Sequence, residues 1–294
     1  MELVKELVSV IVPCYNAENF IKGFIDQIIN QTYQNIELIL VNDGSTDRTE
    51  EIILANQDAC EQRGIVFKYF TYAENKGQAY ALNLGLKHFT GEYLCWIDCD
   101  DVMYSNCLEE KVKYLQTNLK CGFCASDVAI LYQDDVEKID FIHDRYANKK
   151  NIFWDILFFN GMPFHPMARS EAFLSVVPDR EIATGRAGQN LQMLLPLAYN
   201  YEFGYIDKVL TEYVQHKNSH SRLVRSYFER KKDLLNILHQ TLKNIKMDGC
   251  DRLWANKVLF LHRLDMYKTL YLEIRHKLIV WKKRIVPFKL CLWK

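Results

Sequence analysis

The 294-residue sequence predicts an α/β fold with a mainly parallel central sheet flanked by helices, followed by a helical C-terminal extension. Two observations predict the sheet. Runs of β-branched and apolar residues alternate four times with helical segments, an order typical of parallel sheets with right-handed crossovers. Polar clusters also follow three of these runs, at the strand ends where such sheets bind their ligands.

The first predicted strand is Leu7 to Val12, a run suited to burial on both faces. We expect it to end at Pro13, because proline has no N–H to donate to a sheet. Residues 14–18 would then form a loop at its carboxyl end. Apolar residues at helical spacing, from Ile21 to Ile29, predict an amphipathic crossover helix.

Two further strands follow the same plan. Ile36 to Val41 is a second buried strand that runs into the polar residues 42–47, where Gly44 permits a tight turn. Ile65 to Phe70 is the third predicted strand, and residues 77–88 have the pattern of a helix.

The fourth strand begins at Tyr93 and ends in the acidic stretch Asp98-Cys-Asp100-Asp101. Side chains two residues apart in a strand share a face, so Asp98 and Asp100 would converge on one ion or polar ligand. Hard cations such as Mg²⁺ or Mn²⁺ take oxygen ligands and keep positions open for substrate phosphates. The stretch therefore predicts a divalent-cation site, with a solvated acidic turn as the alternative.

The glycine pattern argues against two common nucleotide sites. The segment Pro13-Cys-Tyr-Asn-Ala-Glu18 stands where a dinucleotide fold needs GxGxxG, and the sequence has no GxxxxGK[ST] loop. A nucleotide would therefore be held by side chains and a metal. A nucleotidyltransferase would also need a glycine-rich and basic loop after the first strand, and the sequence has none there.

The composition bears on partners and compartment. Lys plus Arg and Asp plus Glu are balanced at 37 each, so no overall field predicts a nucleic-acid partner. Nine cysteines without evident pairing spacing, and no secretory signal, predict a cytoplasmic protein. No apolar run approaches the roughly 20 residues of a membrane span, which predicts a soluble or peripheral protein.

The second half of the chain is harder to divide. We expect a helix over Ser105 to Lys120, strands over Cys121 to Tyr132 and Lys138 to Phe141, and a short strand over Val209 to Val214. The segment Ile152 to Phe159 is strongly apolar, and its pattern does not decide its structure.

The chain changes character near residue 222, which predicts a main domain over residues 1–222 and a helical, basic and aromatic extension over 223–294. A helix is expected over Trp254 to Glu273. After Glu273 the sequence has seven Lys or Arg residues and no acid, interleaved with apolar and aromatic residues. Such a tail is typical of a helix in the headgroup region of an anionic bilayer, and packing on the core is the alternative.

Several motifs occur together in the order and spacing of one known family. With them, the chain resembles family 2 glycosyltransferases of the GT-A fold, and within these the bacterial enzymes that build capsular, cell-wall or lipopolysaccharide glycans. The resemblance is continuous over roughly the first hundred residues, is weaker to about Arg222, and does not cover the C-terminal helices. It implies a nucleotide-binding half over 1–102 and an acceptor half over 103–222. The motifs that carry it are Val10-Ile-Val-Pro-Cys-Tyr-Asn16, Val41-Asn-Asp-Gly-Ser-Thr-Asp47, Asn75-Lys-Gly77 with Asn83, Gly91-Glu-Tyr93 and Ile97-Asp-Cys-Asp-Asp101.

The resemblance implies a binding site for a UDP-sugar. Within it, Asp43 would accept a hydrogen bond from the uracil imide, which is a donor, and Asp98 would face the ribose. The full set that the resemblance assigns to the donor is Pro13, Tyr15, Glu18, Asp43, Lys76, Asn83 and Asp98.

The resemblance also implies a Mn²⁺ or Mg²⁺ cofactor, held by Asp100 against the two phosphates of the donor. The ion would stabilise the charge that builds on the departing diphosphate. Asp98, Asp101, His216 and His220 are further candidate ligands. For each histidine a surface or structural role is the alternative.

The general base departs from the family pattern. Family members usually carry a Glu-Asp pair at the start of a helix in the acceptor half, and the Asp deprotonates the acceptor hydroxyl as the sugar is inverted. Here Gln189 and Asn190 stand at that place, and amides cannot act as the base. Asp179, Glu181 and His165 are nearby candidates, each with a structural or acceptor-binding role as the alternative.

The sequence therefore predicts an inverting, metal-dependent glycosyltransferase that moves a sugar from a UDP-sugar to a glycan or lipid-linked acceptor hydroxyl in surface polysaccharide synthesis. The alternative, motivated by Gln189 and Asn190, is a non-catalytic nucleotide-sugar-binding partner of another glycosyltransferase. The expected location is the cytoplasm, peripheral on the inner face of the plasma membrane through the C-terminal segment.

Overall fold

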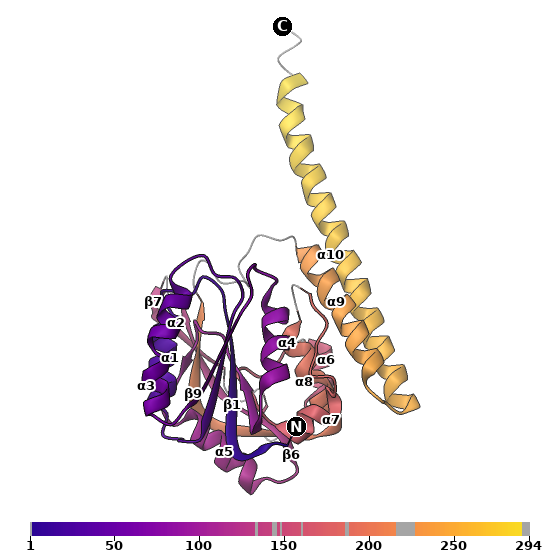
Figure 1. The fold of residues 1–294 in the computed structure, drawn as a ribbon. Coiled ribbons are helices and arrows are strands. Elements are labelled where there is room, and N and C mark those ends of the chain that lie inside the picture. Colours follow the sequence, from indigo (N-terminus) through magenta and orange to yellow (C-terminus); the bar gives the residue numbers. More distant parts are fainter. Residues whose placement is uncertain are drawn as a thin grey trace. The chain divides into compact units, whose positions relative to one another are not determined.

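The computed structural model describes residues 2–132, 135–142, 146–147, 149–159, 161–185, 188–215 and 227–289. The chain forms two compact units, Met1–Leu223 and Val224–Lys294. The first unit is a sheet covered by helices, and the second contains a pair of helices (Figure 1).

Within the described residues, the first unit contains one nine-stranded sheet in the order β3-β2-β1-β4-β8-β6-β9-β5, with β7 paired to β6. Neighbouring strands among β1 to β4 are parallel, as are β6 and β9, whereas β5, β7 and β8 pair antiparallel. The strands are β1 (Val4–Cys14), β2 (Ile36–Asn42), β3 (Val66–Thr71), β4 (Gly91–Trp96), β5 (Val102–Met103), β6 (Cys121–Tyr132), β7 (Asp135–Ile142), β8 (Met167–Arg169) and β9 (Glu202–Gln215).

Helices cover both faces of this sheet. Figure 1 shows α1, α2 and α3 on one side and α4, α6, α7 and α8 on the other. The helices of the first unit are α1 (Ile21–Ile29), α2 (Thr49–Ala55), α3 (Gln57–Gln62), α4 (Gln78–His88), α5 (Cys107–Thr117), α6 (Phe153–Phe159), α7 (Ser170–Val176) and α8 (Gln189–Asn200). The predicted α/β fold with its flanking helices is confirmed.

Burial on both faces explains the apolar character of β1. Val8, Val10 and Val12 belong to the same buried cluster as Phe24 of α1. Ile11 points to the opposite face, as the period of two in a strand requires. There α4 approaches closely at Gly85, where a Cβ would lie 2.4 Å from Cγ2 of Ile11. The absence of a side chain at residue 85 thus permits this close helix–strand packing.

The predicted end of the first strand at Pro13 is wrong by one residue, because β1 continues to Cys14. Its pairing with β4 ends at Ile11, so beyond that residue only β2 lies alongside. Pro13 is in register with Val41 of β2. A proline is tolerated where one side of a strand needs no N–H donor.

Two other expectations in the second half change, and one undecided segment is resolved. The strand predicted over Val209 to Val214 is much longer, because β9 pairs in parallel with β6 along almost its whole length. The undecided apolar segment is the helix α6, and the predicted C-terminal helix is extended to α10 (Gly249–Lys289). Long-range pairing and helix length are both poorly marked in local sequence.

The second unit consists of α9 (Tyr227–Asn244) and α10, which pack against each other. The Arg252 guanidinium of α10 donates to the carbonyl oxygens of Leu242 and Ile245. It thereby satisfies backbone acceptors at the C-terminal end of α9. Among the residues that the structure describes, no helix is both long and apolar enough to span a membrane.

Buried Glu37 of β2 joins β1, β3 and the residue that precedes β4. Its carboxylate accepts hydrogen bonds from Ser9 Oγ of β1, from the Thr90 backbone N–H at 2.9 Å and from Thr90 Oγ1 at 2.7 Å. Lys68 Nζ of β3 lies 2.5 Å away. Burial raises the pKa of Glu37, but the hydrogen bonds from Lys68, Ser9 and Thr90 outweigh it and hold the pKa below its ordinary value.

We expect Glu37→Gln to lower the free energy of unfolding by about 2 kcal/mol at neutral pH, because hydrogen bonds to a charged group are lost. A lowered pKa in the folded state gives stability that is present above the ordinary glutamate pKa and is lost as pH falls through the folded value. The difference between the variant and the wild type should therefore narrow below about pH 4.

Urea unfolding across this pH range measures the effect. Asp26→Asn is the matched control, because it breaks the exposed Lys22–Asp26 pair and should cost less than about 0.5 kcal/mol. A Glu37→Gln deficit that is the same at every pH would contradict the role given to the charge.

Candidate functional site

The loops after β1 and β2 hold each other in place. The Asn16 backbone N–H donates to Ser45 Oγ at 3.0 Å, and Asn16 Oδ1 accepts the Thr46 backbone N–H at 2.9 Å. Glu18 Oε2 accepts the Arg48 backbone N–H at 3.2 Å. The Glu18 carboxylate thus bonds the neighbouring loop. Of the predicted donor residues here, Tyr15, at 50%, and Glu18 are exposed, whereas Pro13 is half-buried.

Asp43 fastens a third loop to the end of β2. Its Oδ1 accepts the Lys76 backbone N–H at 2.9 Å, and its Oδ2 accepts that of Gly77 at 2.7 Å. Gly44 has a φ of +68°, and a Cβ there would lie 2.4 Å from the backbone carbon of Glu74. The backbones of the loops after β2 and β3 are therefore in close contact at Gly44. Only glycine combines this positive φ with the space that the contact leaves.

Lys76 and Asn83 differ in accessibility. The Lys76 ammonium is exposed and lies 4.6 Å from the centre of the Tyr72 ring. Asn83 of α4 is buried, and its amide makes two hydrogen bonds of 2.8 Å with the backbone of Ile182. Asn83 therefore ties α4 to the segment that precedes α8.

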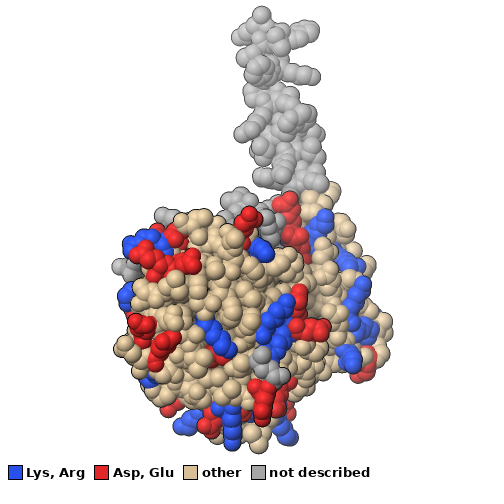
Figure 2. All heavy atoms as spheres, in the orientation of Figure 1, with Lys and Arg blue, Asp and Glu red and all other residues tan. Residues whose placement is uncertain are grey.

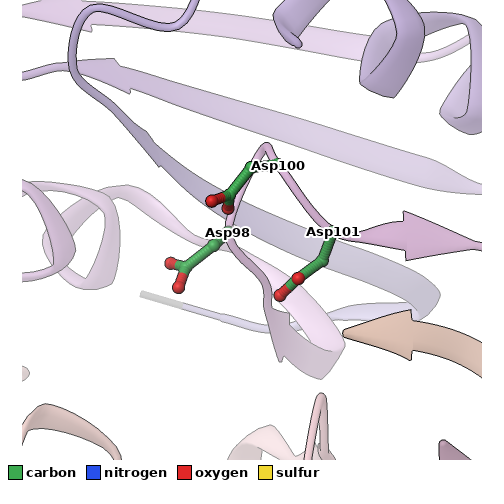
Figure 3. Close-up of side chains that lie close together, drawn as sticks. All are labelled: Asp98, Asp100 and Asp101. Atoms are coloured by element: carbon green, nitrogen blue, oxygen red, sulfur yellow. The ribbon is translucent and has the colours of Figure 1, made fainter. Parts of the chain in front are cut away.

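The predicted acidic site forms after β4. Figure 3 shows the carboxylates of Asp98, Asp100 and Asp101 on the same side of one turn, and one ligand oxygen of each lies within 4.8 Å of the others. Gln78 Nε2 donates to Asp98 Oδ1 at 2.6 Å. Oxygens at this spacing fit around one hard divalent cation.

The electrostatics of the turn also favour a cation. The Asp98 side chain is exposed to solvent, but the protein atoms around it displace part of the water that would hydrate its carboxylate. This burial, and then the negative charges of Asp101 and Asp100, raise the pKa of Asp98 to about 8. A divalent ion would relieve the repulsion among the three carboxylates.

Asp101 connects this turn to the second half of the chain. It is buried, and its Oδ2 lies 2.8 Å from His165 Nε2. Its Oδ1 accepts the Val214 backbone N–H of β9 at 2.9 Å. The carbonyl oxygen of His165 in turn accepts a hydrogen bond of 2.6 Å from Nζ of fully buried Lys111. The predicted ligands His216 and His220 lie outside the described residues.

A cavity of about 330 Å³ opens beside the turn and combines residues from both halves of the chain. Asp98, Asp101 and Gln78 supply its polar wall nearest the turn. Its complete lining is Pro13, Gln78, Leu82, Trp96, Ile97, Asp98, Asp101, Gly161, Met162, Pro163, Phe164, His165, Pro166, Asn190 and Tyr213. The mixture of carboxylates, amides and aromatic rings suits a polar ligand with apolar faces.

Gln189 and Asn190 begin α8, directly after Gly188 with a φ of +77°. Trp96 Nε1 donates to Asn190 Oδ1 at 2.8 Å, and Gln189 Nε2 donates to the Gly185 carbonyl at 3.2 Å. Because an indole N–H can only donate, the oxygen of the Asn190 amide must face Trp96. The NH₂ group is therefore the part left for other partners.

The three candidate bases lie in different surroundings. Glu181 forms an exposed ion pair of 3.1 Å with Lys87, and Asp179 is exposed. Neither lines the cavity, whereas His165 does. His165 Nδ1 is buried and has no hydrogen-bond partner among the described residues.

Gln78 and Trp96 were not expected at this site. Trp96 lies within an apolar strand and has the pattern of a core residue, although its indole N–H holds Asn190. Gln78 directly follows the Asn75-Lys-Gly77 motif, and that position is the one signal that could have identified it.

We expect divalent-cation binding to tighten as pH rises from about 6 to about 8. Because the pKa of Asp98 is raised to about 8, binding below that pH must displace its proton. Displacement of one proton would weaken apparent Mn²⁺ affinity by at most about tenfold for each pH unit below the pKa.

Isothermal titration of Mn²⁺ in buffers of different ionisation enthalpy measures both the affinity and the proton release. Asp98→Asn should bind Mn²⁺ more weakly and without proton release. Wild-type affinity that does not change with pH would contradict the assignment of Asp98.

The sequence matches the model of a known protein family. The model of the family described as glycosyl transferase family 2 matches residues 9–172, more than half of the chain. An uncharacterized glycosyltransferase of Rickettsia typhi is 45% identical over 109 residues, which cover 37% of this chain and 32% of that protein. Glycosyltransferase GlyA of Streptococcus pneumoniae is 38% identical over 125 residues, 41% of this chain and 17% of GlyA. The chain thus spans about a third or less of the length of these relatives.

Solved structures share the fold over most of the chain. TarS 1–349 of S. aureus, solved with UDP-GlcNAc, has a TM-score of 0.67 at 16% identity, covering 86% of this chain and 70% of TarS 1–349. The mannosyltransferase PcManGT of Pyrobaculum calidifontis, solved with GDP-Man and Mn²⁺, has a TM-score of 0.61 at 19% identity. The match covers 86% of this chain and 69% of the PcManGT chain. At these identities the likeness shows the fold.

Proposed function

Because this chain belongs to glycosyl transferase family 2, we propose that it is an inverting, metal-dependent glycosyltransferase that uses a UDP-sugar. The observation that carries the proposal is the acidic turn at the end of β4, which opens into a cavity lined by both halves of the chain. A donor diphosphate at the turn would place its sugar next to an acceptor in the cavity.

Asp98 and Asp100 are the proposed cation ligands, and Asp101 is a third candidate. Mn²⁺ or Mg²⁺ held there would neutralise charge on the donor diphosphate. TarS was solved with UDP-GlcNAc and PcManGT with GDP-Man and Mn²⁺, which supports a nucleotide-sugar and a divalent ion in this fold. Our choice of UDP rests on the resemblance of the loops at Asp43 and Tyr15 to the uridine-binding motif.

The loops after β1, β2 and β3 would bind the nucleotide without large rearrangement, because the hydrogen bonds that hold these loops to one another are already formed. Pro13 and Tyr15 would contact the base and ribose, with Glu18 keeping the first loop in position. Each carboxylate oxygen of Asp43 accepts one backbone N–H, and each retains a second lone pair for another hydrogen bond. We propose that one of these accepts the uracil imide, while Lys76 and Asn83 border the donor pocket.

We expect UDP release from one UDP-sugar in the presence of Mn²⁺, and its loss when a chelator removes the ion. Asp100→Asn should reduce release by at least about 100-fold, because a charged ligand becomes a neutral one. Asp58→Asn, which changes an exposed acid on α3, is the matched control.

Retained, metal-dependent UDP binding without release from any donor, even after acceptor screening, would favour the alternative of a non-catalytic nucleotide-sugar-binding partner. The amides Gln189 and Asn190 at the usual base position motivate that alternative. Chelator-resistant release would instead contradict the metal dependence.

Among the candidate bases we favour His165, because it alone of the three lines the cavity. When Nε2 donates to Asp101, Nδ1 carries the lone pair that could take a proton from the acceptor hydroxyl. Asp101 would then fix the tautomer and the orientation of the ring. A modest side-chain movement must expose Nδ1, since the atom is buried.

We expect His165→Gln to lower UDP-sugar turnover by at least about 100-fold while UDP binding is retained, because general-base catalysis contributes about 10²–10⁴-fold. Glu181→Gln and Asp179→Asn are the matched comparisons and should change turnover by less than about threefold. The assignment fails if one of these two variants loses turnover and His165→Gln does not.

The acceptor and the cellular role are also proposed. A hydroxyl of a glycan or lipid-linked acceptor in surface polysaccharide synthesis suits a cavity that offers both aromatic rings and amides. We propose that the protein acts in the cytoplasm on the inner face of the plasma membrane, to which the basic tail after Glu273 would attach it.

A further inference from the structure

Helix α10 has two apolar faces. Ala255, Val258, Leu259 and Met266 are buried and recur on one side of the helix, and Asp265 on that side forms an ion pair with Lys231 of α9. Seven large apolar residues in the described part of α10 are exposed, and five of them, exposed by 49% to 64%, lie on the other side: Leu253, Phe260, Leu264, Tyr267 and Tyr271. We refer to these five as the exposed stripe. The remaining two, Trp254 and Leu261, lie between the two sides. The packing with α9 explains the first face and leaves the stripe unexplained.

The exposed stripe forms a line along the helix. Its successive members are seven, four, three and four residues apart. Lys257, four residues after Leu253 and three before Phe260, stands on the same line. The sequence repeats the same three- and four-residue intervals to the end of α10, at Ile274, Leu278, Trp281, Ile285 and Phe288. At 1.5 Å per residue the pattern from 253 to 288 covers about 50 Å.

Charges are sorted between the two faces. Helical spacing of 100° per residue places Arg263 on one flank of the exposed stripe and Lys268 on the other. Lys257 lies within the stripe, and its ammonium is 4.6 Å from the centre of the Trp254 ring. Asp251 and Asp265 instead fall on the side of the buried residues, as helical spacing of 100° per residue places them. The tail beyond Glu273 adds seven more bases and no acid.

This charge pattern decides between two occupants. Apolar residues at such spacing often pair with a second copy of the same helix. In that arrangement Lys257 would meet its own counterpart in the seam, and Arg263 and Lys268 would face each other across it. Like charges at these positions oppose pairing, whereas an anionic surface attracts all of them.

We propose that the exposed stripe is a lipid-binding face that lies in the headgroup region of an anionic bilayer. Leu253, Phe260 and Leu264 would enter the acyl boundary, and the tyrosines would sit at headgroup level, where aromatic residues are enriched. Arg263 and Lys268 would contact lipid phosphates. The inference extends the membrane attachment proposed for the tail to the part of α10 that precedes the tail, and it does not depend on glycosyl transfer.

Flotation of the full chain with vesicles tests the apolar part of this face. We expect binding to phosphatidylglycerol-containing vesicles and little binding to phosphatidylcholine alone. Phe260→Ser combined with Leu264→Ser and Tyr267→Ser should reduce partitioning by at least about tenfold. Leu54→Ser with Leu119→Ser, at exposed apolar positions of the first unit, is the matched control and should bind like the wild type.

The basic flanks are tested by Arg263→Gln with Lys268→Gln. Each cation near an anionic surface contributes a factor of about five, so the pair should weaken partitioning by about 25-fold and reduce its salt dependence. Lys243→Gln with Lys246→Gln, at exposed bases near the end of α9, removes the same charge elsewhere in the unit. An equal loss in both double variants would show a non-specific charge effect and overturn the proposal.

Two further results would overturn it. If the triple variant floats like the wild type while Lys282→Gln with Lys283→Gln abolishes flotation, the tail alone binds lipid. If sedimentation equilibrium finds a dimer that the triple variant loses, the stripe binds a second copy. UDP release measured on the same preparations in solution tests the proposed function separately, so failure of one does not entail failure of the other.

Discussion

Assembly of the site depends on the hydrogen bonds of one buried carboxylate. Asp101 has one oxygen 2.8 Å from His165 Nε2, and its other oxygen accepts the Val214 N–H at 2.9 Å. A buried carboxylate is costly unless its oxygens are bonded, so these partners are needed for stability as well as for position. They bring the acidic turn, the segment around His165 and the end of β9 together. The candidate cation ligands and the cavity wall are thereby fixed by the same contact.

The two edges of the sheet use carboxylates in opposite ways. At the amino ends, Glu37 is surrounded by donors, and its pKa is held below the ordinary value. At the carboxyl ends, Asp98 lies beside two other acids, and its pKa is raised to about 8. The first arrangement is complete within the protein and stabilises the strands. The second is incomplete, and a cation would complete it. Figure 2 shows acidic and basic side chains interspersed over the face in view.

Sequence reasoning found what local spacing encodes. The strand runs, the crossover helices and the aspartates two and three residues apart are all local patterns, and the solved structures confirm the expected GT-A fold. It could not find that Asn83 bonds Ile182, or that Trp96 holds Asn190, because those partners are 99 and 94 residues apart. It also missed the second apolar face of α10. Apolar residues on two sides of one helix give no single amphipathic pattern, so the sequence does not separate the residues that face α9 from the exposed stripe.

The long range of the Asp101 contacts has a consequence for the protein as it is synthesised. His165 and Val214 follow Asp101 by 64 and 113 residues, so both leave the ribosome well after the acidic turn. A nascent chain that has folded its first four strands would present the loops after β1 and β2, while Asp101 still lacked both partners. Pausing or truncation before β9 would thus produce a species that has the loops after β1 and β2 but lacks the cavity, and it would expose a carboxylate that the finished protein buries.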